Sequence, residues 1–220
     1  MSAAIRVLLV DDQDLFREGM RVIIDAQDGL EVVGAAADGL EAVEQVDALQ
    51  PDVVLMDIRM PELDGVEATR RIFLPERVRA RARPVRVLVL TTFDLDDRAA
   101  TAIRHGASGF LLKDTTPALL VDAIRTVHGG NAVLAPESLT VLLMGRFADV
   151  SRPPAAFDTL TERERDVFGA VARGASNAEV AAALFTSEST VKTHVGAVLR
   201  KLGLRDRVQL VVFAYEHGLT

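Results

Sequence analysis

Five short, continuous apolar runs in the first 128 residues constrain the fold more than any other feature of this chain. They cover roughly residues 5–10, 31–36, 52–56, 85–91 and 109–112. Runs of this length without polar alternation are typical of strands whose two faces are both covered. Between the runs, apolar residues recur at helical spacing, as at Phe16, Met20 and Ile23. The alternation predicts an α/β domain with a parallel sheet.

We expect this domain to be a flavodoxin-like, doubly wound, five-stranded parallel sheet, although alternation alone leaves other strand orders open. From residue 158 onward the pattern is purely helical, with capping-box spacing at Thr161/Glu164 and at Ser176/Glu179. Two short helices joined by the turn 185–187 predict a helix-turn-helix within a small all-α, four-helix domain. The predicted division is 1–129 for the α/β domain, 130–156 for a linker with a short helix around 136–147, and 157–220 for the helical domain.

Composition narrows the class of protein. The 220 residues contain no cysteine, which excludes disulfides, zinc–thiolate sites and a thiol nucleophile. No apolar stretch is long enough to span a bilayer, and the N-terminus lacks a signal-peptide pattern, so we expect a soluble, cytoplasmic protein with no membrane partner. The net charge of −7 lies within residues 1–129, whereas residues 157–220 are neutral overall. A basic cluster in that neutral part could contact the phosphate backbone of a nucleic acid. The simpler alternative is that these residues form a solvated helix face.

Polar residues stand where the apolar runs end. Asp11 and Asp12 follow the first run, Asp57 the third, Thr91 the fourth and Lys113 the fifth. Parallel strands present their carboxyl ends at one edge of the sheet, where ligands bind. Carboxylates suit Mg²⁺, an Asp carboxylate can accept a phosphoryl group, and a hydroxyl and an ammonium can hold the product. Taken singly, each residue is more often a helix cap, a turn former or a surface charge, so the prediction depends on the combination.

Residues 5–128 resemble a response-regulator receiver domain. The matching segments are VLLVDD (7–12), PDVVLMDIRMP (51–61), DG (64–65), VLTTF (89–93) and GASGFLLK (106–113). The resemblance implies that Asp57 is the phosphoacceptor and that Mg²⁺ is held by Asp11, Asp12, Asp57 and the backbone carbonyl of Arg59. It also implies that Thr91 is the switch hydroxyl, that Lys113 binds phosphate and that the rotamer of Phe110 follows the switch; for Phe110, simple core packing is the alternative.

Two features depart from the commonest receiver pattern. Asp114 follows Lys113, where many receivers have proline. An aspartate at this position resembles the NarL/FixJ subfamily. The arginine-rich segment 75–84 is longer than usual, and we expect it to be an exposed loop whose role the sequence leaves open.

Residues 160–217 resemble the LuxR-type output domain of NarL/FixJ regulators, through LTERE (160–164), ARGASNAEVA (172–181), SESTVKTHV (187–195) and LRKLG (199–203). Val191, Val195 and Val198 share an inward face of the third helix, which leaves other faces to a major groove. Lys192 is the best base-reading candidate, followed by Thr193, and His194 is more easily explained by packing. The remaining DNA-contact candidates are Ser189, Thr190, Arg200 and Lys201. In this family the fourth helix forms a dimer, which implicates Val208, Val211, Val212 and Tyr215; the effect of Gly196 on DNA reading stays open.

The two resemblances together imply a two-component response regulator that binds promoter DNA. Its expected partners are a sensor histidine kinase, double-stranded DNA, a second copy upon phosphorylation and, as an option, RNA polymerase. The chain is not expected to be an enzyme beyond its own phosphoryl transfer and dephosphorylation. Two alternatives remain: a haloacid-dehalogenase-type phosphatase, disfavoured by Arg59 where a second Asp is wanted, and a regulator of this fold controlled by ligand or protein binding.

Overall fold

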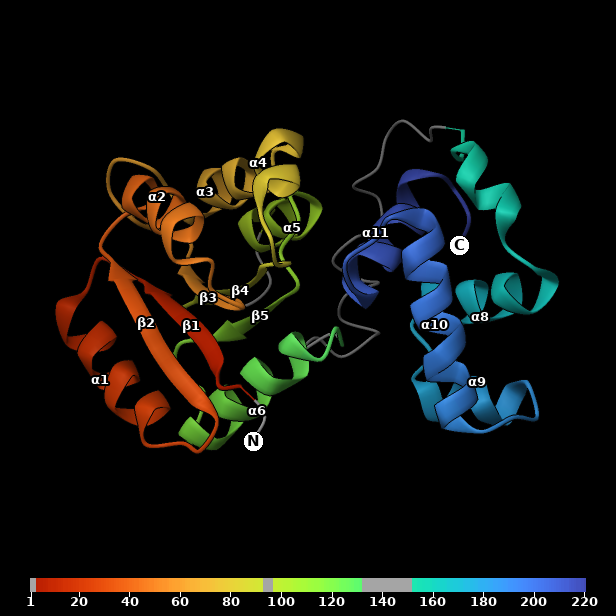
Figure 1. The fold of residues 1–220 in the computed structure, drawn as a ribbon, viewed down its shortest axis with the longest axis horizontal. Coiled ribbons are helices and arrows are strands. Elements are labelled where there is room, and N and C mark those ends of the chain that lie inside the picture. The colour runs from red at the N-terminus through yellow and green to blue at the C-terminus, as the bar shows by residue number, and fades with distance from the viewer. Residues whose placement is uncertain (1–2, 93–96, 132–151) are drawn as a thin grey trace. The chain divides into compact units, whose positions relative to one another are not determined.

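The computed structural model describes residues 3–92, 97–131 and 152–220 (Figure 1). The chain divides into two compact units, residues 1–133 and 134–220. This division falls inside the segment 130–156 that the sequence predicts as a linker. The helix expected around 136–147 lies outside the described residues. Among the described helices, none has the length and apolar character needed to cross a membrane.

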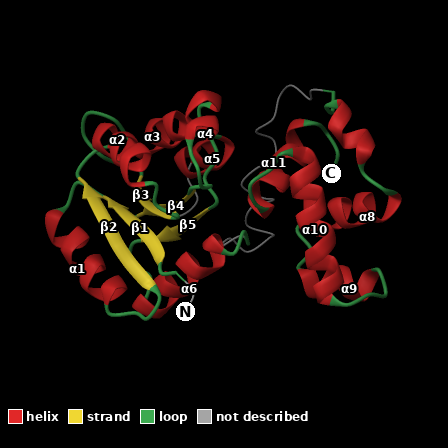
Figure 2. Ribbon diagram, viewed as in Figure 1, coloured by secondary structure: helices red, strands yellow, loops and turns green. Residues whose placement is uncertain are grey.

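The first unit is built on a five-stranded parallel sheet, as predicted (Figure 2). The strands are β1 (Ile5–Val10), β2 (Leu30–Ala36), β3 (Val53–Asp57), β4 (Arg86–Thr91) and β5 (Gly109–Leu112). Their spatial order is β2-β1-β3-β4-β5, which is the flavodoxin-like order. β1 and β3 therefore lie side by side at the centre, with β4 beside β3, and the ends of these three strands are neighbours.

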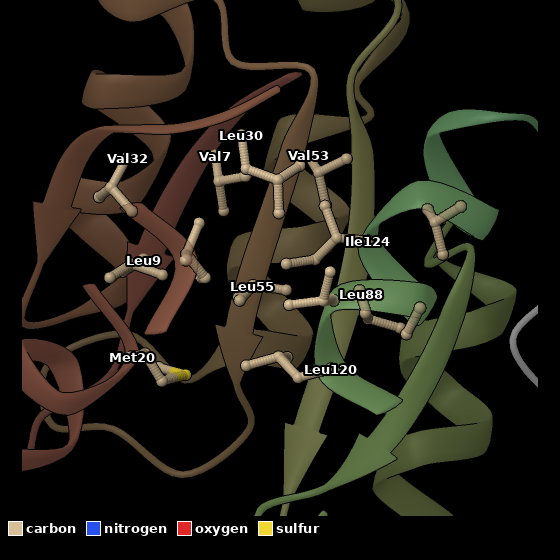
Figure 3. Close-up of a cluster of buried hydrophobic side chains, with 14 of the residues drawn as sticks. Val7, Leu9, Met20, Leu30, Val32, Val53, Leu55, Leu88, Leu120 and Ile124 are labelled. Atoms are coloured by element: carbon tan, nitrogen blue, oxygen red, sulfur yellow. The ribbon is translucent and has the colours of Figure 1, made fainter. Parts of the chain in front are cut away.

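Helices cover both faces of this sheet, which explains why the strands are apolar without alternation. α1 (Asp14–Asp25) and α6 (Pro117–His128) lie on one face, and α2 (Gly39–Leu49), α3 (Gly65–Ile72) and α5 (Asp97–Arg104) lie on the other (Figure 1). Figure 3 shows the core on the α1/α6 face, where Met20 of α1 and Leu120 and Ile124 of α6 pack against strand residues such as Leu55 and Leu88. This packing fixes the strand ends that carry the polar residues.

The prediction that residues 75–84 form a loop is wrong for their first part. Pro75–Ala80 form a short helix, α4, which buries none of its residues. The apolar periodicity that reveals a helix in sequence is missing there because the segment is held by polar contacts instead. Arg81 donates hydrogen bonds to Asp47 at the end of α2 and to the carbonyl oxygen of Ile72 in α3.

The second unit is helical, as predicted. A short 3₁₀ helix, η1 (Ala155–Thr159), precedes α8 (Glu162–Ala172), α9 (Asn177–Ala183), α10 (Glu188–Leu202) and α11 (Arg207–Glu216). Both predicted capping boxes are present, at Thr161/Glu164 and at Ser176/Glu179. Val191 and Val198 of α10 are fully buried in the core of this unit, and Val195 packs against it. The short α9, a tight turn and the longer α10 form the expected helix-turn-helix.

Candidate functional site

Three carboxylates converge at the carboxyl edge of the sheet. Asp11 directly follows β1, and Asp57 is the last residue of the neighbouring β3. One carboxylate oxygen each from Asp11, Asp12 and Asp57 lies within 4.8 Å of the others. Asp11 and Asp57 are buried, whereas Asp12 is exposed. Oxygen atoms at this spacing, two of them in a low-dielectric environment and one facing solvent, form a suitable set of ligands for a hard divalent cation.

Lys113 bridges the two buried carboxylates. Its Nζ lies 2.6 Å from Oδ2 of Asp11 and 2.9 Å from Oδ2 of Asp57, and its side chain is only 9 % exposed. The residue follows β5, and its backbone N–H donates to the carbonyl oxygen of Thr91 at 2.7 Å. The same ammonium lies 4.9 Å from the ring centroid of Phe16. Lys113 is therefore fixed beside Asp57, where it can stabilise negative charge.

Burial and charge oppose one another at Asp57. Burial raises the pKa of this carboxyl above its ordinary value, and the neighbouring Asp11 adds to the rise, although the hydrogen bond and charge of Lys113 partly offset it. Burial lowers the pKa of Lys113, but the hydrogen bonds that its ammonium donates to Asp11 and Asp57 outweigh this effect, so the pKa of the ammonium lies above its ordinary value. Two buried anions share one cation, so the site has an excess of negative charge that a further cation would offset.

The other predicted residues of this site lie on the same sheet edge. Thr91 is the buried last residue of β4. Phe110 lies in β5, is partly buried and pairs with Val89 of β4. The backbone of Arg59 donates a hydrogen bond that lowers the pKa of Asp57, which places this peptide beside the carboxylate. The switch roles of Thr91 and Phe110 and the ligand role of the Arg59 carbonyl stay predictions.

Three positioning residues are evident only in the structure. A Cβ atom at Gly65 would lie 1.9 Å from the carbonyl oxygen of Asp57, so only glycine allows this close approach. Arg17 donates to the carbonyl oxygen of Asp11, and Phe16 lies against Lys113. The DG pair at 64–65 belongs to the receiver resemblance but looks like an ordinary turn, and Phe16 looks like an ordinary core residue, so neither revealed its positioning role in the sequence.

In the helical unit, the predicted DNA-contact residues gather on α10. Ser187 caps the helix by accepting the N–H of Thr190 at 3.1 Å, and its hydroxyl lies 2.8 Å from that of Ser189. Lys192, Thr193 and Arg200 are exposed, and His194 is partly buried. Gly196 lies between Lys192 and Arg200 on the helix, and a Cβ atom there would meet nothing within 4 Å. Packing therefore does not require a glycine at this position.

Lys201 has partners inside its own unit. Its Nζ lies 2.6 Å from Oε2 of Glu164 in α8 and donates to the carbonyl oxygen of Thr159 at 3.0 Å. The charge of Lys201 is thus largely neutralised within the domain. A phosphate contact by this residue stays a prediction, but it would compete with the Glu164 ion pair.

Each of the two units matches a known protein family. The family description "response regulator receiver domain" matches residues 7–125, and "bacterial regulatory proteins, luxR family" matches residues 158–214. The chain belongs to the response regulators with a LuxR-type output domain. This family consists of transcriptional regulators rather than enzymes, so the phosphatase alternative is set aside.

Similar proteins cover the whole response regulator. This chain is 38% identical to the transcriptional regulatory protein LnrK of Bacillus subtilis, with 98% of this chain and 99% of that protein covered. It is also 38% identical to the response regulator protein VraR of Staphylococcus aureus, with 98% of each covered. Among solved structures, the response regulator ChrA of a heme-sensing two-component system matches over 100% of both chains, with 36% identity and a TM-score of 0.50. The receiver domain of a putative response regulator NarL from Mycobacterium tuberculosis matches 59% of this chain and 100% of that one, with 37% identity and a TM-score of 0.53.

The predicted dimer residues of this response regulator lie on α11. Val208, Val211 and Val212 are at most 3% exposed, and Tyr215 is partly buried. None of these three valines belongs to the core cluster of the helical unit, to which the same helix contributes Leu210 and Phe213. A dimer contact through these residues stays a prediction.

Proposed function

We propose that this response regulator is switched by phosphorylation of Asp57 and that the phosphorylated form binds promoter DNA as a homodimer. The observation that carries the proposal is the convergence of Asp11, Asp12 and Asp57 beside the ammonium of Lys113. A sensor histidine kinase is the proposed donor. A carboxylate oxygen of Asp57 attacks the phosphorus atom, the bond to the kinase histidine breaks, and the imidazole leaves.

Mg²⁺ fits this site, because three carboxylate oxygens lie within 4.8 Å of one another and the two buried carboxylates share a single ammonium. We propose that Asp11, Asp12, Asp57 and the carbonyl of Arg59 hold the ion. A bound divalent cation supplies charge neutralisation that lets an anionic donor approach. Lys113 then stabilises the oxygens of the transferred group, and Thr91 donates its hydroxyl to them.

The output follows from the charge added at Asp57. An aspartyl-phosphate brings negative charge and acceptor oxygens to the carboxyl edge, and Thr91 and Phe110 reorient in response. This change biases an equilibrium between an occluded form and a DNA-binding dimer that associates through Val208, Val211, Val212 and Tyr215. Lys192 and Thr193 read bases, whereas Ser189, Thr190 and Arg200 contact phosphates. As a DNA-binding regulator, the protein is proposed to act in the cytoplasm. RNA polymerase is a further candidate partner.

The test is phosphorylation by a small-molecule phosphodonor in the presence of Mg²⁺. Intact-mass measurement should show the gain of one phosphoryl group in the wild type and none in Asp57→Ala. Asp28→Ala, which removes an exposed carboxylate of the same domain, is the matched control and should gain the group normally. Chelation of the cation should abolish the gain in the wild type and in Asp28→Ala.

Oligomeric state and affinity for promoter DNA should be measured on the same samples. We expect the donor to increase both dimerisation and DNA affinity for the wild type and for Asp28→Ala, and to leave Asp57→Ala unchanged. If the wild type incorporates no phosphoryl group, or incorporates it without any change in DNA affinity, the regulator is instead controlled by ligand or protein binding.

A further inference from the structure

A second charged surface lies at the opposite end of the receiver sheet. Five arginines fall within ten residues, at positions 77, 79, 81, 83 and 86. The stretch runs from α4 to the first residue of β4. Because the strands are parallel, the amino end of β4 lies at the edge away from Asp57. The acidic site therefore does not use these arginines.

The arginine segment is fixed to the domain by one of its own members. The side chain of Arg81 is only 4% exposed, and its guanidinium donates to Asp47 at 2.8 and 3.1 Å and to the carbonyl oxygen of Ile72 at 2.7 Å. The backbone N–H of Ala82 donates to the side chain of Gln50 at 3.1 Å. Arg81 is thus an anchor, and the residues on either side of it are held in place on the surface.

This surface carries more positive charge than its neighbours neutralise. Arg77 and Arg81 share the single carboxylate of Asp47. Arg79 and Arg83 are exposed, and neither makes an ion pair within the described part of the chain. The residues that surround the ion pair leave an open depression of about 520 Å³, lined by Leu74, Glu76 and Ala80 in addition to the paired groups.

We propose that this arginine surface binds the phosphate backbone of duplex DNA next to the site occupied by the output domain. Guanidinium groups match phosphate geometry, and such contacts position a protein without reading sequence. A mobile acidic protein segment could also bind these arginines. The charge of the output domain favours DNA instead. The output domain has no net charge, and Lys201 is paired with Glu164, so this cation is not free to contact phosphates and further positive charge on the receiver would add to binding.

Tethering strengthens the argument for DNA. Once the output domain is on a duplex, the receiver of the same chain meets flanking phosphates at high effective concentration. A few exposed arginines then suffice for a contact that would be too weak alone. The inference depends only on the DNA binding that the family shows, and not on phosphorylation of Asp57.

The test is the salt dependence of binding by the full-length protein to a long duplex of random sequence. Each lost phosphate contact should reduce the slope of log affinity against log salt by about 0.9. For Arg79→Gln/Arg83→Gln we expect a slope that is smaller by roughly 1.8 and weaker binding at low salt. Arg81 is left intact, so that the segment stays anchored. Arg79→Lys/Arg83→Lys, which keeps both charges, should restore most of the slope.

The matched control is Arg70→Gln/Arg125→Gln, which removes the same charge from the receiver at α3 and α6. It separates a local contact from the general effect of net charge and should leave the slope unchanged. Equal losses in the two double variants, or a wild-type slope for Arg79→Gln/Arg83→Gln, would overturn the proposal. In the second case an acidic protein would be the better candidate for this surface. Failure of phosphorylation at Asp57 would not affect either measurement.

Discussion

At the scale of single residues, the position of Asp57 depends on a neighbour with no side chain. The N–H of Gly65 donates to the carbonyl oxygen of Ile58 at 2.9 Å, and this contact brings Gly65 against the backbone of Asp57. A methyl group at Gly65 would overlap the Asp57 carbonyl oxygen at 1.9 Å, and the obstructing atom is backbone, which cannot rotate away. The chain at the end of β3 must therefore shift to accommodate any other residue.

Gly65→Ala should reduce phosphoryl incorporation at Asp57 by roughly 10- to 100-fold, because small displacements of a reacting group have effects of this size. The rate is measured by intact mass over time with a small-molecule donor. Gly19→Ala in α1 is the control, since a Cβ atom there meets nothing within 4 Å, and it should keep the wild-type rate. Equal rates in both variants would mean that the loop adjusts without moving Asp57.

At the scale of elements, the turn of the helix-turn-helix contains a strained residue. Phe185 follows α9 with φ +51°, in the left-handed region, and its side chain is 98% exposed. Arg163 of α8 donates to the carbonyl oxygen of Leu184 and so ties the turn to α8. The phenyl ring thus contributes almost no packing, although its Cβ atom adds backbone strain.

Phe185→Gly should raise the free energy of unfolding of the output domain by about 1 kcal/mol, because glycine adopts the left-handed conformation without a steric cost. Denaturant titration of the wild type and the variant measures the difference. Phe185→Ala keeps the Cβ atom and should show little gain. A less stable glycine variant would mean that the ring makes contacts that offset the strain.

The junction of α8 and α10 is predicted to depend on pH. The hydrogen bond from Lys201, together with the N–H of Thr161, lowers the pKa of Glu164 from 4.5 to about 2. A carboxylate with a depressed pKa stabilises the fold fully above pH 4.5, and this contribution is lost as the pH falls from 4.5 towards 2. The ion pair joins the start of α8 to the end of α10, so it ties the last turn of α10 to the rest of the domain.

Glu164→Gln should therefore lower the stability of the output domain at pH 7, and the difference from wild type should shrink below pH 4.5 and vanish near pH 2. Thermal melts over this pH range provide the measurement. Glu162→Gln removes an exposed carboxylate from the same helical turn and should show no such pH-dependent difference. A Glu164→Gln deficit that persists unchanged at pH 2 would indicate lost packing instead of a lost charge interaction.

At the scale of the whole molecule, the sequence predicts every strand end of the sheet to within one residue. Strands covered on both faces must be continuously apolar, so their limits are visible in composition alone. The meeting of Asp57 with Asp11 and Lys113 follows from the rule that parallel strands end at a common edge. Helix α4 was missed because Arg81 and Asp47 hold it, and a contact between residues 34 positions apart leaves no local periodicity. For the same reason, the sequence did not reveal that Lys201 pairs with Glu164.

The two edges of the receiver sheet differ in sign. Carboxylates gather where the strands end, and guanidinium groups gather where β4 begins. These two clusters contribute a dipole component that runs roughly along the strands. A polyanion approaching at low ionic strength would turn the domain arginine-first before any contact forms, and the torque would fade once the Debye length falls to about 8 Å at physiological salt. The proposed contact of the arginine surface with DNA is thereby biased in orientation.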